Sequence, residues 1–65
     1  MEHVKTTANL KAPDDIYDIL IHAHDGLTKP QSDALNARLI LILLNHIGDE
    51  KIIAEALQMA RLAAV

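Results

Sequence analysis

The stretch of residues 29–47 restricts the fold more than any other part of the chain, because its apolar residues cover most of a helical circumference. Only a narrow polar stripe interrupts them, formed at seven-residue intervals by Gln31, Arg38 and Asn45, with Ile42 close beside it. A helix that is apolar on most sides must be buried on most sides. We therefore predict a helix that lies at the centre of a helical assembly.

Capping residues mark both ends of this predicted helix. Thr28 and Gln31 have the spacing of a capping box, in which each side chain bonds the backbone N–H of the other residue. Gly48 follows the last apolar residue, where a left-handed conformation commonly ends a helix. Asp49 can then cap a third helix, which we predict to run from residue 50 to about residue 62.

A further helix is predicted at the amino-terminal side. It begins at Pro13, because proline suits the first helical position, and Gly26 is expected to end it. Apolar residues recur there at three- and four-residue spacing, as on one face of a helix. These residues are Ile16, Ile19, Leu20 and Ala23.

The remaining residues complete the predicted organisation. Residues 1–12 have neither helical nor alternating periodicity, so they are expected to form a flexible tail. Residues 13–65 are expected to form a single helical domain. Connections this short force consecutive helices into antiparallel hairpins or tight corners, and the predicted fold is all-α, a three-helix antiparallel bundle.

The middle helix also predicts a partner. Two flanking helices can cover about half of its surface, and the rest would be a larger apolar patch than soluble monomers usually expose. We therefore predict a homodimer or homo-oligomer joined through this helix, in which polar residues fix the register. The predicted interface is Leu35, Leu39, Ile40, Leu41, Ile42, Leu43, Leu44 and Ile47, with Asn36, Arg38 and Asn45 as the register residues.

Two alternatives to self-association remain open. In the first, the three helices form a compact monomer in which Leu41 and Ile42 are half-exposed. In the second, the apolar patch faces a different, larger protein, which the sequence alone does not distinguish from a second copy.

Size and composition agree with the need for a partner. A chain of 65 residues buries only about 60% of its unfolded surface, and without Cys it has neither disulfides nor thiolate zinc sites. The net charge of −3, with only six Lys and Arg, disfavours nucleic-acid binding. The longest apolar run, residues 39–44, is far shorter than the roughly 20 residues of a membrane span. With no signal segment at the amino terminus, we expect a cytoplasmic protein.

Few residues suggest chemistry. Asp14, Asp18, His22 and Asp25 recur at helical spacing and could bind a divalent metal, but a solvated acidic face with pairing between Asp18 and His22 explains them more simply. Ser32 has no nearby His pattern that could activate it, and no phosphate-binding loop, HExxH or CxxC occurs. We therefore predict no catalytic, cofactor or metal site.

His24 is interpreted differently from the residues of the acidic face. Two residues apart on a helix, His22 and His24 point in nearly opposite directions, so they form a poor ligand pair. We expect His24 to be an interfacial side chain with one bonded nitrogen.

Several segments resemble a short, largely proteobacterial family catalogued as a domain of unknown function, number 2783. They are residues 16–17, 24–27 and especially 34–49, within which Leu-Asn-Ala-Arg-Leu and Asn-His-Ile-Gly-Asp are the most specific parts. The similarity covers residues 13–61. The family has no assigned activity, so the resemblance implies no catalytic residue. Because members can be encoded near flavin-dependent oxidoreductases of aromatic catabolism, it implies an accessory subunit with such an enzyme as a larger partner.

The function predicted from the sequence is that of a non-enzymatic helical interaction or accessory subunit that self-associates. One alternative is a small metal-binding or enzymatic helical protein that uses the face of Asp18, His22 and Asp25. Another is a regulatory module that sequesters a transcription or signalling protein.

Overall fold

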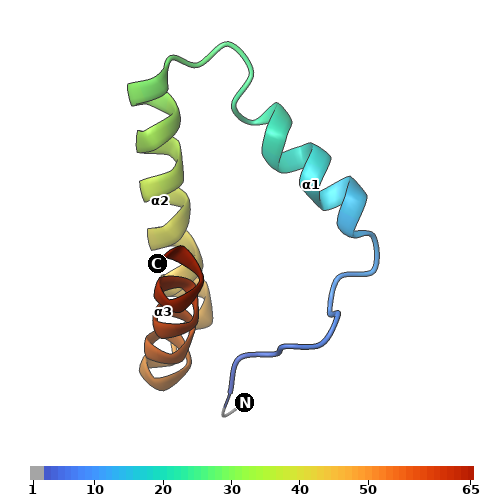
Figure 1. Ribbon diagram of the computed structural model, residues 1–65. Helices are drawn as coiled ribbons and strands as arrows, with labels where there is room; N and C mark the ends of the chain where they lie inside the picture. The colour runs from blue at the N-terminus through green and yellow to red at the C-terminus, as the bar shows by residue number, and fades with distance from the viewer. Residues whose placement is uncertain (1–2) are drawn as a thin grey trace.

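The structure, a computed structural model, describes residues 3–65 (Figure 1). This part of the chain contains three α-helices and no strands: α1 (Pro13–His22), α2 (Lys29–Ile47) and α3 (Glu50–Ala64). The predicted all-α fold class is confirmed. None of the helices in the described part combines the length and the apolar character needed to cross a membrane.

The ends of α2 and the start of α3 follow the predicted capping chemistry. The Gln31 N–H donates to Thr28 Oγ1 at 3.3 Å, and the Thr28 N–H donates to Gln31 Oε1 at 3.0 Å, which completes the capping box. Gly48 ends α2 in the left-handed region, with φ of 68°. Asp49 Oδ1 accepts the N–H groups of Lys51 at 2.9 Å and of Ile52 at 3.2 Å, and so caps α3.

The end of α1 was predicted wrongly. The helix begins at Pro13 but ends at His22, well before Gly26. After Ala23 the backbone bonds tighten to three-residue spacing, from the His24 N–H to Ile21 O and from the Asp25 N–H to His22 O, both 3.1 Å. Such bonds form turns rather than α-helix, and Gly26, with φ of 74°, lies within this turn segment.

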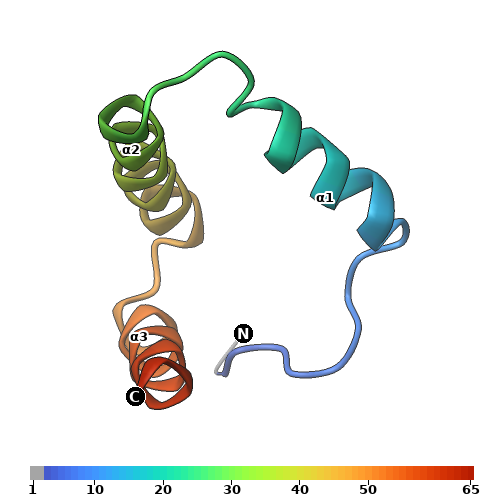
Figure 2. The same ribbon diagram turned by 45° about the horizontal axis from the view of Figure 1, so that its top comes forward.

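The three helices form an open arrangement (Figures 1 and 2). Only α2 and α3 bring Cα atoms within 8 Å of each other among the described helices. The two helices meet at a corner at Gly48, whereas α1 diverges from α2 beyond the connecting turn. The predicted antiparallel bundle is therefore not closed within one chain, because short connections bring helix ends together without fixing the angle between the axes.

Very little of the single chain is buried. Ile52, 5% exposed at the corner between α2 and α3, is the one buried side chain of the described residues. The accessible surface is 5960 Å², against about 4,100 Å² for a compact monomer of 7.1 kDa. The radius of gyration is 13.6 Å, against about 11 Å for a compact domain of this length. Both quantities describe an expanded chain.

The amino-terminal segment is bonded to α3. Glu55 accepts two hydrogen bonds from it, one from the Val4 N–H at 2.9 Å and one from His3 Nδ1 at 3.0 Å. Residues 3–12 contain no helix, and they lead from this contact to the start of α1 (Figure 2). The first two residues of the predicted flexible tail lie outside the described residues.

Candidate interaction surface

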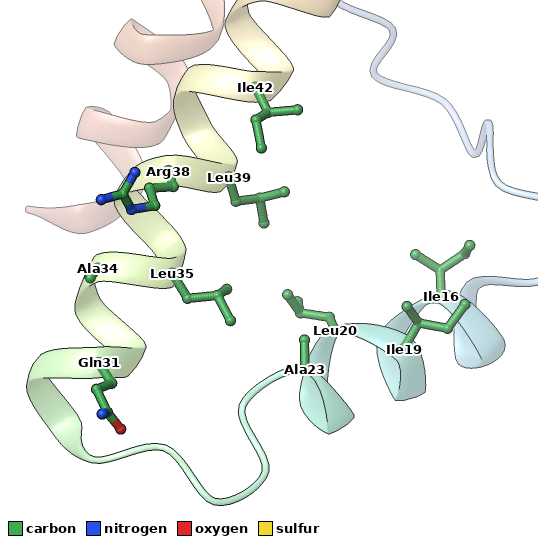
Figure 3. Close-up of a pocket in the computed structure, with 10 residues that line it drawn as sticks. All are labelled: Ile16, Ile19, Leu20, Ala23, Gln31, Ala34, Leu35, Arg38, Leu39 and Ile42. Atoms are coloured by element: carbon green, nitrogen blue, oxygen red, sulfur yellow. The ribbon is translucent and has the colours of Figure 1, made fainter.

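An open groove lies between α1 and α2 (Figure 3). Its volume is about 670 Å³, and its lining is almost entirely apolar. The α1 wall consists of Ile16, Ile19, Leu20 and Ala23, and the α2 wall consists of Gln31, Ala34, Leu35, Arg38, Leu39 and Ile42.

Helical periodicity produces both walls. On α1 the lining residues are the face predicted from three- and four-residue spacing, and on α2 the same spacing brings Leu35, Leu39 and Ile42 to one side. Figure 3 shows Leu20 and Leu35 pointing toward each other from the two walls, with Ile16 and Ile42 nearer the wide end. The two helices therefore form a V with an apolar interior.

A hydrogen bond holds the narrow end of the V. His24 Nδ1 lies 2.9 Å from Ser32 Oγ, and both residues are half-buried. This contact links the turn after α1 to the first turns of α2, and it provides the bonded nitrogen expected for His24. The interfacial role of His24 stays a prediction.

The same bond corrects the expectation that Ser32 has no His partner. The two residues are eight positions apart, and only the turn between the helices brings them together. The cap at Thr28 was the sequence signal, because it placed a chain reversal between His24 and Ser32. Neither residue lines the groove, so we interpret the pair as a clip that holds the turn.

The polar stripe of α2 borders the groove. Two of its members, Gln31 and Arg38, are among the lining residues, and Ile42 belongs to the same wall, while Figure 3 shows the Arg38 side chain directed to the side of α2 away from α1. Gln31, Arg38 and Asn45 are all exposed, so the stripe borders the open groove without being buried in it. Arg38 forms no ion pair with any residue of the 3–65 range.

The residues predicted to form the interface differ in exposure. Leu35, Leu39 and Leu44 are half-buried, whereas the other five are between 45% and 66% exposed: Ile40, Leu41, Ile42, Leu43 and Ile47. The register residues Asn36, Arg38 and Asn45 are exposed as well. These side chains are accessible to a partner, and their role as an interface stays a prediction.

The acidic face of α1 lacks the predicted pairing. His22 Nδ1 donates to the backbone carbonyl of Asp18 at 2.7 Å instead of to its carboxylate. Asp25 lies in the turn beyond the helix end, so it does not continue the helical row. Within residues 3–65, no three His, Asp or Glu side chains come close enough together to hold a metal ion.

The fold and the groove define a small all-helical protein whose apolar faces are largely uncovered. The chain matches, over residues 4–62, the family described as a protein of unknown function, DUF2783. Because this match spans nearly the whole chain, the protein belongs to that family, and the predicted resemblance is confirmed. No curated protein and no solved structure matches the chain.

Proposed function

We propose that this protein is a non-enzymatic helical subunit that self-associates through α2 and the adjoining groove. The observation that carries the proposal is the accessible surface of 5960 Å², which exceeds that of a compact monomer of this mass by about 1,900 Å². Apolar side chains contribute much of it, because sixteen large hydrophobic residues of the described part of the chain are exposed.

The excess area is of the size that a permanent partner would cover. A standard protein interface buries about 800 Å² on each partner, and obligate homodimers bury roughly 2,000–5,000 Å² in total. An excess of about 1,900 Å² per chain corresponds to the obligate class. A transient interface would be too small to cover it and would leave most of this excess surface exposed to water.

A second copy is the simplest partner for this surface. In a two-fold symmetric dimer the same patch serves on both chains, so one contact covers the exposed side chains of each. The predicted antiparallel bundle would then form between chains. The alternative partner is a larger protein, for which the family resemblance implied a flavin-dependent oxidoreductase.

Sedimentation equilibrium tests the proposal directly. Wild-type protein is expected to have twice the 7.1 kDa mass of one chain, or a higher multiple. Leu41→Asp, on α2, should dissociate the assembly, because it places an unpaired charge in an apolar contact. The matched control is Leu62→Asp on α3, since Leu41 is 66% and Leu62 is 67% exposed. Wild-type protein that stays monomeric at high concentration would refute self-association.

A further inference from the structure

We propose that two copies interlock, so that α2 of each chain lies in the groove between α1 and α2 of the other. This inference rests on the proposed self-association and specifies its geometry. In such a dimer α1 covers the α2 of the second copy instead of its own, and the two α2 helices lie side by side at the centre.

The first support is that α1 lacks cover within its own chain. None of its Cα atoms comes within 8 Å of α2 or α3. Its groove-facing side chains Ile16, Ile19 and Leu20 are 47%, 67% and 39% exposed. Isolated helices shorter than about 12–15 residues are marginal in water, and α1 has 10 residues. Contact with another helix would supply the missing stability.

The described chain offers no segment of its own to fill the groove. α3 turns away at the Gly48 corner, and the amino-terminal segment is bonded to Glu55 on α3 instead of lying between α1 and α2. None of residues 3–12 and no residue of α3 lines the groove. The occupant must therefore come from another molecule.

The α2 helix of a second copy has the required shape and surface. It is 19 residues long, and its lining residues form an apolar face along several turns. Two-fold symmetry requires that when α2 enters the partner's groove, the partner's α2 enters this one. A single contact would thereby cover one face of α1 and one face of α2 in each chain. An interface of this kind matches the excess accessible surface of about 1,900 Å² per chain.

The charges at the groove are complementary between copies. α1 carries Asp14, Asp15 and Asp18 without any Lys or Arg, and none of the three forms an ion pair within residues 3–65. Asp15 directly precedes Ile16 and lies at the rim of the groove-facing side by helical periodicity. In the interlocked dimer α1 lies against the partner's α2, whose Arg38 forms no ion pair with residues 3–65 of its own chain.

The absence of cysteine makes a disulfide test selective. One chain carries Ile19→Cys on α1, and a second, size-tagged chain carries Ile40→Cys, which helical periodicity places on the side of α2 opposite its groove-lining residues. The two are mixed, equilibrated and oxidised, so that any mixed disulfide joins different chains. A disulfide needs Cα atoms closer than about 7 Å, so the interlocked dimer should give the mixed product. Leu20→Cys on α1 serves as a second probe at the neighbouring position.

The control replaces the α1 probe with Leu62→Cys on α3. Leu62 and Ile19 are equally exposed, at 67%, so random collision would link both to Ile40→Cys at the same rate. We expect several-fold more mixed disulfide from the two α1 probes. A dimer in which neither α1 probe exceeds the control would overturn the interlocked geometry and leave self-association standing. Monomeric protein throughout would refute both.

A charge exchange gives an independent test that needs no oxidation. Arg38→Glu should weaken dimerisation, measured by sedimentation, because the introduced carboxylate would lie near the like charge of Asp15 on the partner's α1. Adding Asp15→Lys should restore much of the loss. Adding Lys at an acidic position far from the groove, Glu50→Lys, should restore none. Equal recovery from both second changes would contradict the proposed contact.

Discussion

Gly48 provides the left-handed backbone conformation at the corner between α2 and α3. Its φ of 68° lies in the left-handed region, which costs an ordinary residue roughly 1–2 kcal/mol. A Cβ there would meet only the Asn45 backbone oxygen at 3.7 Å, an ordinary van der Waals contact. The requirement for glycine is therefore conformational rather than steric.

Replacing this glycine tests that explanation. Gly48→Ala should lower the free energy of unfolding by roughly 1 kcal/mol, measured by urea unfolding followed by circular dichroism. Gly48→Asn should cost less, because asparagine tolerates the left-handed region better than alanine. Equal losses from the two substitutions would mean that the space around the residue matters more than its φ.

Glu55 connects the amino-terminal segment to α3 in a pH-dependent way. The hydrogen bond from His3, followed by the bond from the Val4 N–H, lowers the pKa of the Glu55 carboxyl below its ordinary value of 4.5. A depressed folded-state pKa contributes stability above the unfolded value, and this contribution is lost as the pH falls through the folded value. The tail contact should therefore weaken on acidification below about pH 4.5.

Hydrogen exchange at the Val4 amide can measure this loss. The wild-type amide should be protected at neutral pH and lose protection as Glu55 becomes protonated. In Glu55→Gln the amide oxygen still accepts a hydrogen bond but does not titrate, so the acid-dependent change should disappear. An unaltered pH profile in that variant would assign the change to another group.

At the level of the helices, local capping chemistry was predictable and the end of α1 was not. The caps at Thr28 and Asp49 depend only on residues within one turn, so the sequence contains all the required information. α1 ended early because backbone bonds of three-residue spacing replaced the helical ones before Gly26 was reached. Nothing in the side-chain pattern distinguishes these two kinds of bond.

The capping box of α2 yields a direct prediction. Thr28→Ala removes the side-chain acceptor of the Gln31 N–H and should lower the free energy of unfolding by about 1 kcal/mol. Thr28→Ser keeps the hydroxyl and should retain most of the stability. Thermal unfolding followed by circular dichroism compares the three proteins, and similar losses in both variants would show that the methyl group of Thr28 matters instead.

For the whole molecule, the sequence predicted which side chains are apolar but not which neighbours cover them. Periodicity located the faces of α1 and α2, and the structure places the α1 face and part of the α2 face along one groove. The angle between the helices was not predictable, because it depends on packing among distant residues. The pairing of His24 with Ser32 was missed for the same reason, since a turn geometry creates it.

Leu43 distinguishes stability within one chain from stability in an assembly. It is 48% exposed here, so Leu43→Asp should disturb a lone chain little, whereas in a dimer it would place a charge in an apolar contact. Wild-type protein should melt at higher temperature as its concentration rises, because association stabilises the folded state. Leu43→Asp should remove that dependence on concentration. A wild-type melting temperature that does not change with protein concentration would contradict the assembly.

Ile52, the one side chain buried among residues 3–65, has a consequence for the amount of protein a cell must make. In the proposed assembly, a newly made chain would gain most of its stability only on meeting another, so folding and pairing would become one event. Below a threshold abundance, the unpaired chain would be open to proteolysis. The rate of synthesis would then determine both the number of chains made and the fraction of them that escapes proteolysis.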